Sequence, residues 1–155
     1  MAVSERRRGD PAAVSGPGRG HSIDVDATSY LVAGDESAIP AIGQLVDALP
    51  ATARTTVIVE VARPDARVAF TDRSNVEVQW VDLPPGAEPG AALVPAVLGS
   101  EITTDETRVW AAGEAAAMQR IRGHLFTVLG MPRSRATVRG YWKHGRTSGD
   151  EDGGE

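Results

Sequence analysis

The stretch "SYLVAGDESAIPAIGQLVDALP", residues 29–50, carries the clearest structural pattern in the chain. Residues 29–33 are short and apolar, as in a buried strand. After a Gly-acid turn, residues 37–49 place apolar side chains at helical spacing, and Pro40 lies in the first turn, where its missing N–H costs nothing. A similar order returns in "RVWAAGEAAAMQRIRGHL", residues 108–125. Both stretches predict a strand, a tight turn carrying an acid, and a helix.

The rest of the chain continues this alternation. Further strands are predicted over residues 54–62, 75–83, 107–113 and 136–142, and further helices over 91–102 and 114–130. Pro95 is expected to interrupt or bend the weaker helix, 91–102. Alternating strands and helices, with mostly apolar strands, predict an α/β three-layer sandwich around a mostly parallel five-stranded sheet. Ligands of such sheets bind beyond the carboxyl ends of the strands, where we expect both turns.

Composition predicts one domain with two terminal extensions. Residues 1–24 are rich in Gly, Pro, Ser and Arg and are expected to be a disordered linker, and the acidic tail 148–155 is expected to be disordered too. The domain then spans residues 25–147. No apolar run approaches the roughly 18 residues of a membrane helix, and no secretory signal is evident, so we expect a cytoplasmic protein without membrane insertion. The absence of cysteine excludes disulfides, thiolate metal sites and cysteine catalysis.

The net charge of −5 is unevenly distributed. Residues 24–107 carry fourteen acids against four arginines, a net of −10, whereas residues 108–147 carry eight basic residues against one acid, a net of +7. A domain with one basic end can concentrate an anionic ligand there. Alternatively, these arginines only solvate the last helix and strand. Nucleic acid is not an expected partner, because the acidic portion would repel phosphates.

The two acid-bearing turns are candidate ligand sites. A helix N-terminus offers unpaired amides and partial positive charge, and glycine allows the backbone to approach a ligand closely. Neither turn has the G-x-G-x-x-G or G-x-x-x-x-G-K-[ST] pattern, and their acids and serine could instead cap the helices. Both interpretations stay open. The residues concerned are Gly34, Asp35, Glu36 and Ser37 in the first turn and Ala112, Gly113 and Glu114 in the second.

Two further features could contact a ligand. Glu60 ends the second strand, where dinucleotide-binding folds often contact ribose, although it could equally be an exposed strand-end acid. Residues 139–146, "RGYWKHGR", form a basic tail that could stack a planar ring and hold an anion, or whose Trp142 could cover the core edge. The tail residues with this chemistry are Arg139, Tyr141, Trp142, Lys143, His144 and Arg146. Because no histidines share metal-ligand spacing and no G-x-S-x-G occurs, we assign no metal or catalytic residue.

Several blocks together resemble a known family. "YLVAGDESAIPAI", "VEVA", "WAAGEAAAMQRIRGHL" and "LGMPRSRATVRGYWKHG" are similar, in this order over residues 28–146, to the C-terminal domain of siderophore-interacting proteins. The family's members are FAD-dependent ferric-siderophore reductases related to ferredoxin reductases. The resemblance therefore implies a ferredoxin-reductase-like, NAD(P)H-binding fold and an oxidoreductase role in iron acquisition.

The resemblance also implies roles for single positions. It places residues 34–37 close to where flavin and nicotinamide meet, Glu60 as the strand-end acid, and the block Trp110–Glu114 in the region of the pyridine dinucleotide. It places the basic tail against the anionic ferric siderophore. Here Ser37 replaces the family's threonine, and His144 replaces a second permanent cation, so the tail's charge would vary between about pH 6 and 7.

One departure from the family affects the cofactor. Complete members begin with a flavin-binding barrel carrying an Arg-x-Tyr-Ser/Thr motif, which we do not expect in these 155 residues, since Tyr30 and Tyr141 lie in no such motif. We therefore expect NAD(P)H but not FAD to bind this chain alone, with a separate flavin-barrel protein as a possible partner. A non-catalytic siderophore- or nucleotide-binding module and a truncated relic are the alternatives. Arg63 or Arg67 could meet a 2′-phosphate, but the sequence does not decide between NADH and NADPH.

Overall fold

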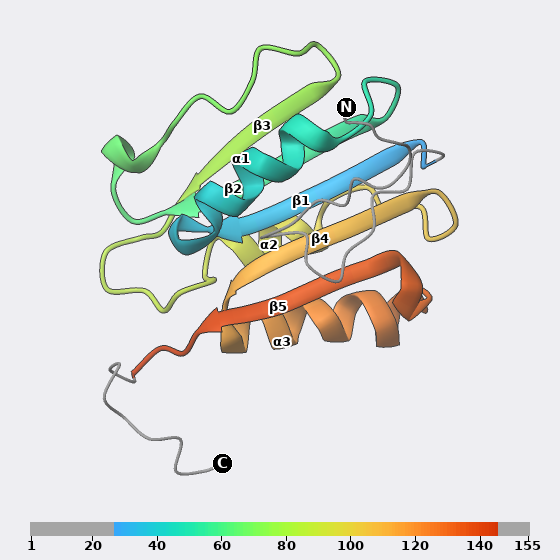
Figure 1. The fold of residues 1–155 in the computed structure, drawn as a ribbon. Helices are drawn as coiled ribbons and strands as arrows, with labels where there is room; N and C mark the ends of the chain where they lie inside the picture. The colour runs from blue at the N-terminus through green and yellow to red at the C-terminus, as the bar shows by residue number, and fades with distance from the viewer. Residues whose placement is uncertain (1–26, 146–155) are drawn as a thin grey trace.

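The computed structural model describes residues 27–145, which form one five-stranded sheet flanked by helices (Figure 1). All four neighbouring strand pairs are parallel, and the strand order is β3-β2-β1-β4-β5. The predicted α/β architecture is confirmed, and the sheet is parallel throughout. The predicted disorder of residues 1–24 and 148–155 concerns segments outside the described residues. The strands are β1 (Ser29–Asp35), β2 (Arg54–Val61), β3 (Val76–Asp82), β4 (Thr107–Glu114) and β5 (Ala136–Trp142).

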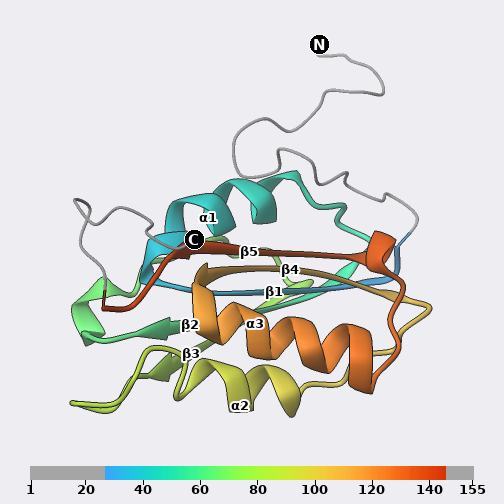
Figure 2. The ribbon, with the colours of Figure 1, turned by 90° about the horizontal axis from the view of Figure 1, so that it is seen from below.

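Helices cover both faces of the sheet (Figure 2). Helix α1 (Ile39–Ala48) packs on one face, and α2 (Leu93–Leu98) and α3 (Ala115–Gly123) pack on the other. Each face buries its own apolar cluster, so the central strands β1, β2 and β4 are almost continuously buried, as expected for a doubly covered parallel sheet. Val76, Val78 and Trp80 of β3 all pack toward the α1 side, as their alternation predicts.

Two predicted helices end differently from expectation. Helix α2 is shorter than 91–102, and Pro95 lies in its first turn, where no donor is missed, so it does not bend the helix. The helix predicted over 114–130 is α-helical only to Gly123 and continues as a π-helix over His124–Val128. The wider turn keeps Leu125 fully buried, and the Met131 amide closes the segment by donating to the Leu125 carbonyl at 2.9 Å.

The start of α1 also differs in a way that affects the site. Strand β1 continues through Gly34 and Asp35, which were predicted to lie in a turn, and a 3-10 turn over Glu36–Ala38 leads into α1. The chain runs from β1 outward to β2 and β3, and then returns to place β4 on the other side of β1. The carboxyl ends of β1 and β4 therefore form the switch point of the sheet, the usual ligand position in such folds. Among the described residues, no helix has the length and apolar character needed to cross a membrane.

Candidate functional site

Asp35 is the centre of the polar network at the switch point. Its Oδ1 accepts hydrogen bonds from the Ser37 amide at 3.0 Å and from the Ser37 hydroxyl. Its Oδ2 accepts from the Glu114 amide and from the Trp142 indole N–H, both at 3.0 Å. The carboxylate is 8% exposed. One buried acid thus joins the end of β1, the start of α3 and the end of β5.

Glu114 makes the second connection. Its Oε1 accepts from the Ala117 amide at 2.9 Å and caps α3, while Oε2 accepts from the His144 amide at 3.3 Å. Burial alone would raise the pKa of Glu114, but hydrogen bonds from the Ala117, Ala116 and His144 amides, with the nearby His144 charge, outweigh it and hold the pKa below its ordinary value. The carboxylate is therefore held in its charged form, with the basic tail attached to it.

The capping interpretation is confirmed at both turns. Asp35 accepts from the Ser37 amide and caps the 3-10 turn before α1, whose own N-cap residue, Ala38, makes no side-chain cap. Glu114 accepts from the Ala117 amide and caps α3. Close packing within the chain also explains why glycine occupies positions 34 and 113. A Cβ on Gly34 would lie 2.8 Å from the Ala112 carbonyl oxygen, and one on Gly113 would lie 2.7 Å from Asp35 Oδ2. Contact of these turns with a ligand stays a prediction, and basic side chains are better placed than the capped amides to hold an anion.

A cleft of about 390 Å³ opens beside this network. It brings Glu114, from the predicted cofactor residues, together with Lys143 and His144, from the predicted siderophore residues. Three basic side chains therefore lie with two carboxylates at the start of α3. The lining residues are Glu88, Pro89, Glu114, Ala115, Ala116, Gln119, Arg120, Lys143 and His144.

The sequence did not reveal the parts of this cleft that come from Glu88, Gln119 and Arg120. Arg120 is one of eight basic residues over 108–147, and the charge pattern alone does not separate those that could hold an anion from those that only solvate α3. A usable signal existed, because Ala116, Gln119 and Arg120 share one helix face at i, i+3 and i+4 spacing, one turn from the capping acid. Glu88 lies in a loop, whose course no periodic pattern predicts.

The structure divides the basic tail between two places. Lys143 and His144 line the cleft, and the Trp142 ring, 40% exposed, is fixed over Asp35 by its N–H. Tyr141 instead packs edge-on against the buried Trp110 ring, on the α1 side of the sheet, with ring centroids 6.5 Å apart. Arg139 is exposed on β5 and does not line the cleft, and Arg146 lies outside the described residues. Trp142 is therefore partly a cover for the network and partly an exposed aromatic surface.

Glu60 is buried, so the expectation of an exposed strand-end acid is wrong. Its side chain is 3% exposed, and its two oxygens accept from the amides of Gly90, Ala92 and Leu93, each at 2.9 Å. The carboxylate holds the loop before α2 and lies at the N-terminal end of that helix, where negative charge is favourable. A contact between Glu60 and ribose stays a prediction.

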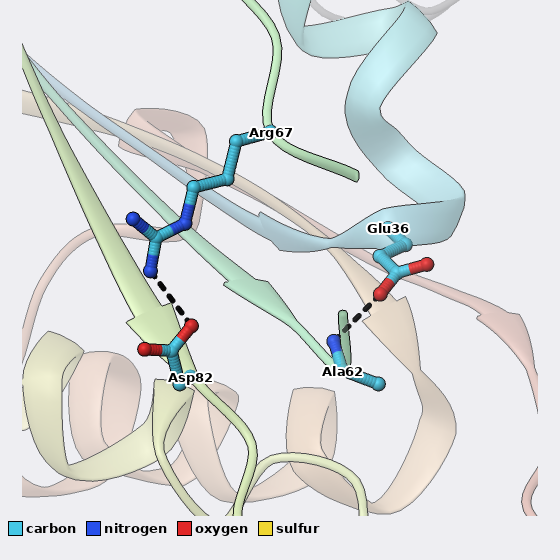
Figure 3. Close-up of polar contacts among 4 residues, drawn as sticks. All are labelled: Glu36, Ala62, Arg67 and Asp82. Atoms are coloured by element: carbon cyan, nitrogen blue, oxygen red, sulfur yellow. Dashed lines mark hydrogen bonds and ion pairs between the residues drawn. The ribbon is translucent and has the colours of Figure 1, made fainter. Parts of the chain in front are cut away.

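Figure 3 shows a second group of polar side chains at the carboxyl edge, beyond the end of β2. Glu36 reaches from the end of β1 to the Ala62 amide, which donates to Oε2 at 2.6 Å. Arg67 forms an ion pair with Asp82 of β3, with 2.7 Å between Nη2 and Oδ1. The Arg67 and Asp82 side chains are 40% and 63% exposed, so this pair faces solvent.

The opposite edge of the sheet carries another cleft, of about 450 Å³. It lies at the amino ends of the strands and is lined by residues that include Ser29, Arg54 and Thr107. None of the predicted site residues lines it.

Comparison with known proteins identifies the family of this chain. A family model described as siderophore-interacting protein matches residues 27–145. The chain belongs to the siderophore-interacting protein family. It is 38% identical over 151 residues to an uncharacterised protein of Mycobacterium tuberculosis (strain ATCC 25618 / H37Rv), with 91% of the chain and 53% of the relative covered.

Two further members connect the family to siderophores by name. Ferric vibriobactin reductase ViuB of Vibrio cholerae (El Tor Inaba N16961) is 24% identical over 139 residues, covering 89% of the chain and 51% of ViuB. The crystal structure of a siderophore utilization protein from T. fusca matches with 33% identity and a TM-score of 0.69, covering 81% of the chain and 48% of that protein. The chain spans about half the length of the curated relatives it matches.

Proposed function

We propose that this chain is the NAD(P)H-binding half of a ferric-siderophore reductase system and works in the cytoplasm with a separate flavin-bearing protein. The observation that supports this most is the Asp35 carboxylate, which joins the switch-point strands to the basic tail. In a chain of the siderophore-interacting protein family, one expected dinucleotide residue, Glu114, lines the same cleft as two expected siderophore residues, Lys143 and His144.

The cleft offers a cationic group that would suit a pyridine dinucleotide. It lies at the switch point of a parallel sheet, and the Arg120 guanidinium in its wall could donate to a phosphate. When bound, NAD(P)H would supply a hydride. The chain's own part is to hold the phosphates and to orient the nicotinamide toward the partner, with Trp142 as an aromatic surface beside it.

The residues present do not fit FAD. The family's flavin motif is Arg-x-Tyr-Ser/Thr. Tyr30 is buried in β1 and has Thr28 in place of the arginine, and Tyr141 follows Arg139 at the right spacing but is followed by Trp142. We therefore derive no flavin chemistry from this chain. Since a hydride carries two electrons and ferric iron accepts one, the intermediary would have to come from outside residues 27–145.

The basic tail would hold the ferric siderophore. Lys143 and His144 line the same cleft as Glu114, so an anionic siderophore and the dinucleotide would approach each other there. This arrangement would bring both substrates to the surface that the flavin partner must reach.

Calorimetric titration of the purified chain with NADH, NADPH and FAD, each alone, tests the proposal. We expect saturable micromolar binding of a dinucleotide and no binding of FAD. Arg120→Gln should weaken the dinucleotide affinity about tenfold, as loss of one charge-assisted contact would. Arg133→Gln is the matched control, since Arg133 stacks on Phe126 outside the cleft. Binding of FAD would contradict the need for a partner, and binding of no dinucleotide would leave a siderophore-binding module, testable with a ferric siderophore, as the better account.

A further inference from the structure

The carboxyl end of β2 carries an acid and an ion pair that the proposed function has not yet used (Figure 3). Three strand ends contribute to this group. Glu36 follows β1, Ala62 follows β2, and Asp82 ends β3. Arg67 lies in the loop after β2, and its Nη2 donates a hydrogen bond to Asp82 Oδ1 at 2.7 Å.

We propose that Glu36 and the Arg67–Asp82 ion pair form the subsite for the adenosine ribose and select NADH over NADPH. The inference rests on the proposed function, because it assumes a pyridine dinucleotide at this edge. It assigns the ribose contact to the residue that follows the first strand, in place of Glu60 near the end of the second. It thereby departs from the family resemblance, which implies that residues 34–37 lie near the nicotinamide.

Glu36 is better placed for this contact than Glu60. In sheets of this kind, a carboxylate beyond the end of the second strand receives the ribose 2′-hydroxyl. Both Glu60 oxygens are buried against the amides of the loop before α2. Glu36 reaches the same strand end from outside, and among residues 27–145 the Ala62 amide is its one hydrogen-bond partner. Its second oxygen, Oε1, is thus available to accept a bond from a ribose hydroxyl.

The charges at this position favour a free hydroxyl over a phosphate. A 2′-phosphate would add a charge of about −1.5 to −2 beside Glu36. The Arg67 guanidinium already pairs with Asp82, so a phosphate that used Arg67 would have to displace that carboxylate. Arg63 is 69% exposed, and its Nε lies 3.8 Å from Asp65 Oδ1, so this guanidinium also faces an acid of its own loop. A neutral hydroxyl leaves all these pairings in place.

Titration of four forms of the full chain with NADH and with NADPH tests the inference. We expect the wild type to bind NADH about tenfold more tightly than NADPH. Glu36→Gln should weaken the affinity for NADH about tenfold and so reduce the preference for NADH over NADPH. Asp82→Asn should strengthen the affinity for NADPH by a similar factor, because it frees Arg67. Asp47→Asn removes an exposed acid near the other end of α1 and should leave both affinities unchanged.

Each outcome bears on a different claim. Equal affinities in the wild type, or tighter binding of NADPH, would overturn the inference and leave the proposed function intact. If Glu36→Gln or Asp82→Asn leaves the ratio of the NADH and NADPH affinities unchanged, the substituted residue is not part of the subsite. Binding of neither dinucleotide to the wild type would overturn the inference and the proposed function together. Asp82 is exposed and makes its described contact only with Arg67, so Asp82→Asn keeps the test valid if Glu36→Gln fails to fold.

Discussion

The Asp35 carboxylate accepts the Trp142 indole N–H at 3.0 Å, although 107 positions separate the two residues in the chain. The same oxygen accepts the Glu114 amide at 3.0 Å. The basic tail therefore does not leave β5 freely, because one buried acid at the end of β1 holds it against the start of α3. The orientation of Lys143 and His144 toward the cleft follows from this attachment.

Asp35→Asn should destabilise the protein by about 2–3 kcal/mol, because hydrogen bonds to a buried charge are among the stronger ones and the new amide group would face donors. Urea denaturation followed by tryptophan fluorescence measures the change. Asp47→Asn, an exposed acid in α1, should stay within about 0.5 kcal/mol of the wild type. Equal midpoints for the wild type and Asp35→Asn would contradict the network.

Glu114→Gln should change the pH dependence of stability in one direction. The pKa of Glu114 in the folded protein is below its ordinary value of 4.5. The charged carboxylate therefore stabilises the fold above about pH 4.5, and this contribution disappears as the pH falls through the lower, folded value. The variant should be less stable than the wild type at pH 7, and the difference should shrink between pH 4.5 and pH 3. A stability difference between the wild type and Glu114→Gln that grows as the pH falls would contradict a lowered pKa of Glu114.

Gly113→Ala and Gly123→Ala should have opposite effects. A Cβ on Gly113 would lie 2.9 Å from Asp35 Cγ, so crowding of the network should cost about 1–3 kcal/mol. Gly123 has no atom within 4 Å of the added Cβ and ends α3, so alanine should stabilise the helix by about 0.5–1 kcal/mol. Thermal unfolding measures the midpoint temperature of each variant. Midpoints that shift in the same direction in both variants would count against the close packing at the switch point.

Glu60→Gln should cost about 2–3 kcal/mol, because three backbone amides would share the single oxygen of the new amide group. Hydrogen exchange of the Gly90, Ala92 and Leu93 amides should accelerate in the variant. Glu36→Gln is the control, since its half-exposed carboxylate accepts one described amide and should matter little for stability. A fully stable Glu60→Gln variant would contradict the structural role of these three hydrogen bonds.

Local periodicity predicted most of the fold. The strand expected over 136–142 matches β5 at both ends, and the apolar spacing of α1 and the order of elements are correct. These patterns succeed because each central strand is buried on both faces and each helix buries one side. The end of α3 was not predictable, since nothing in the apolar spacing separates a π-helix over 124–128 from a further α-helical turn.

The site was predicted in its location but not in its contacts. Family resemblance and strand ends placed the important acids at one edge, which the structure reproduces for Asp35 and Glu114. The partners of Glu60 lie 30 to 33 residues away in a loop, and Arg120 joins the cleft from a helix face. Such contacts depend on how loops and helices pack, which single-sequence patterns do not encode.

Amide chemical shifts of the isotope-labelled chain, recorded by NMR during a titration with NADH, test the central claim most directly. The account predicts shifts concentrated in residues 34–37, 112–116 and 142–145, at the carboxyl edge of the sheet. Residues of the opposite cleft, among them Ser29, Arg54 and Thr107, should stay unchanged. Shifts confined to that opposite cleft, or no shifts at millimolar NADH, would contradict a dinucleotide site at the switch point.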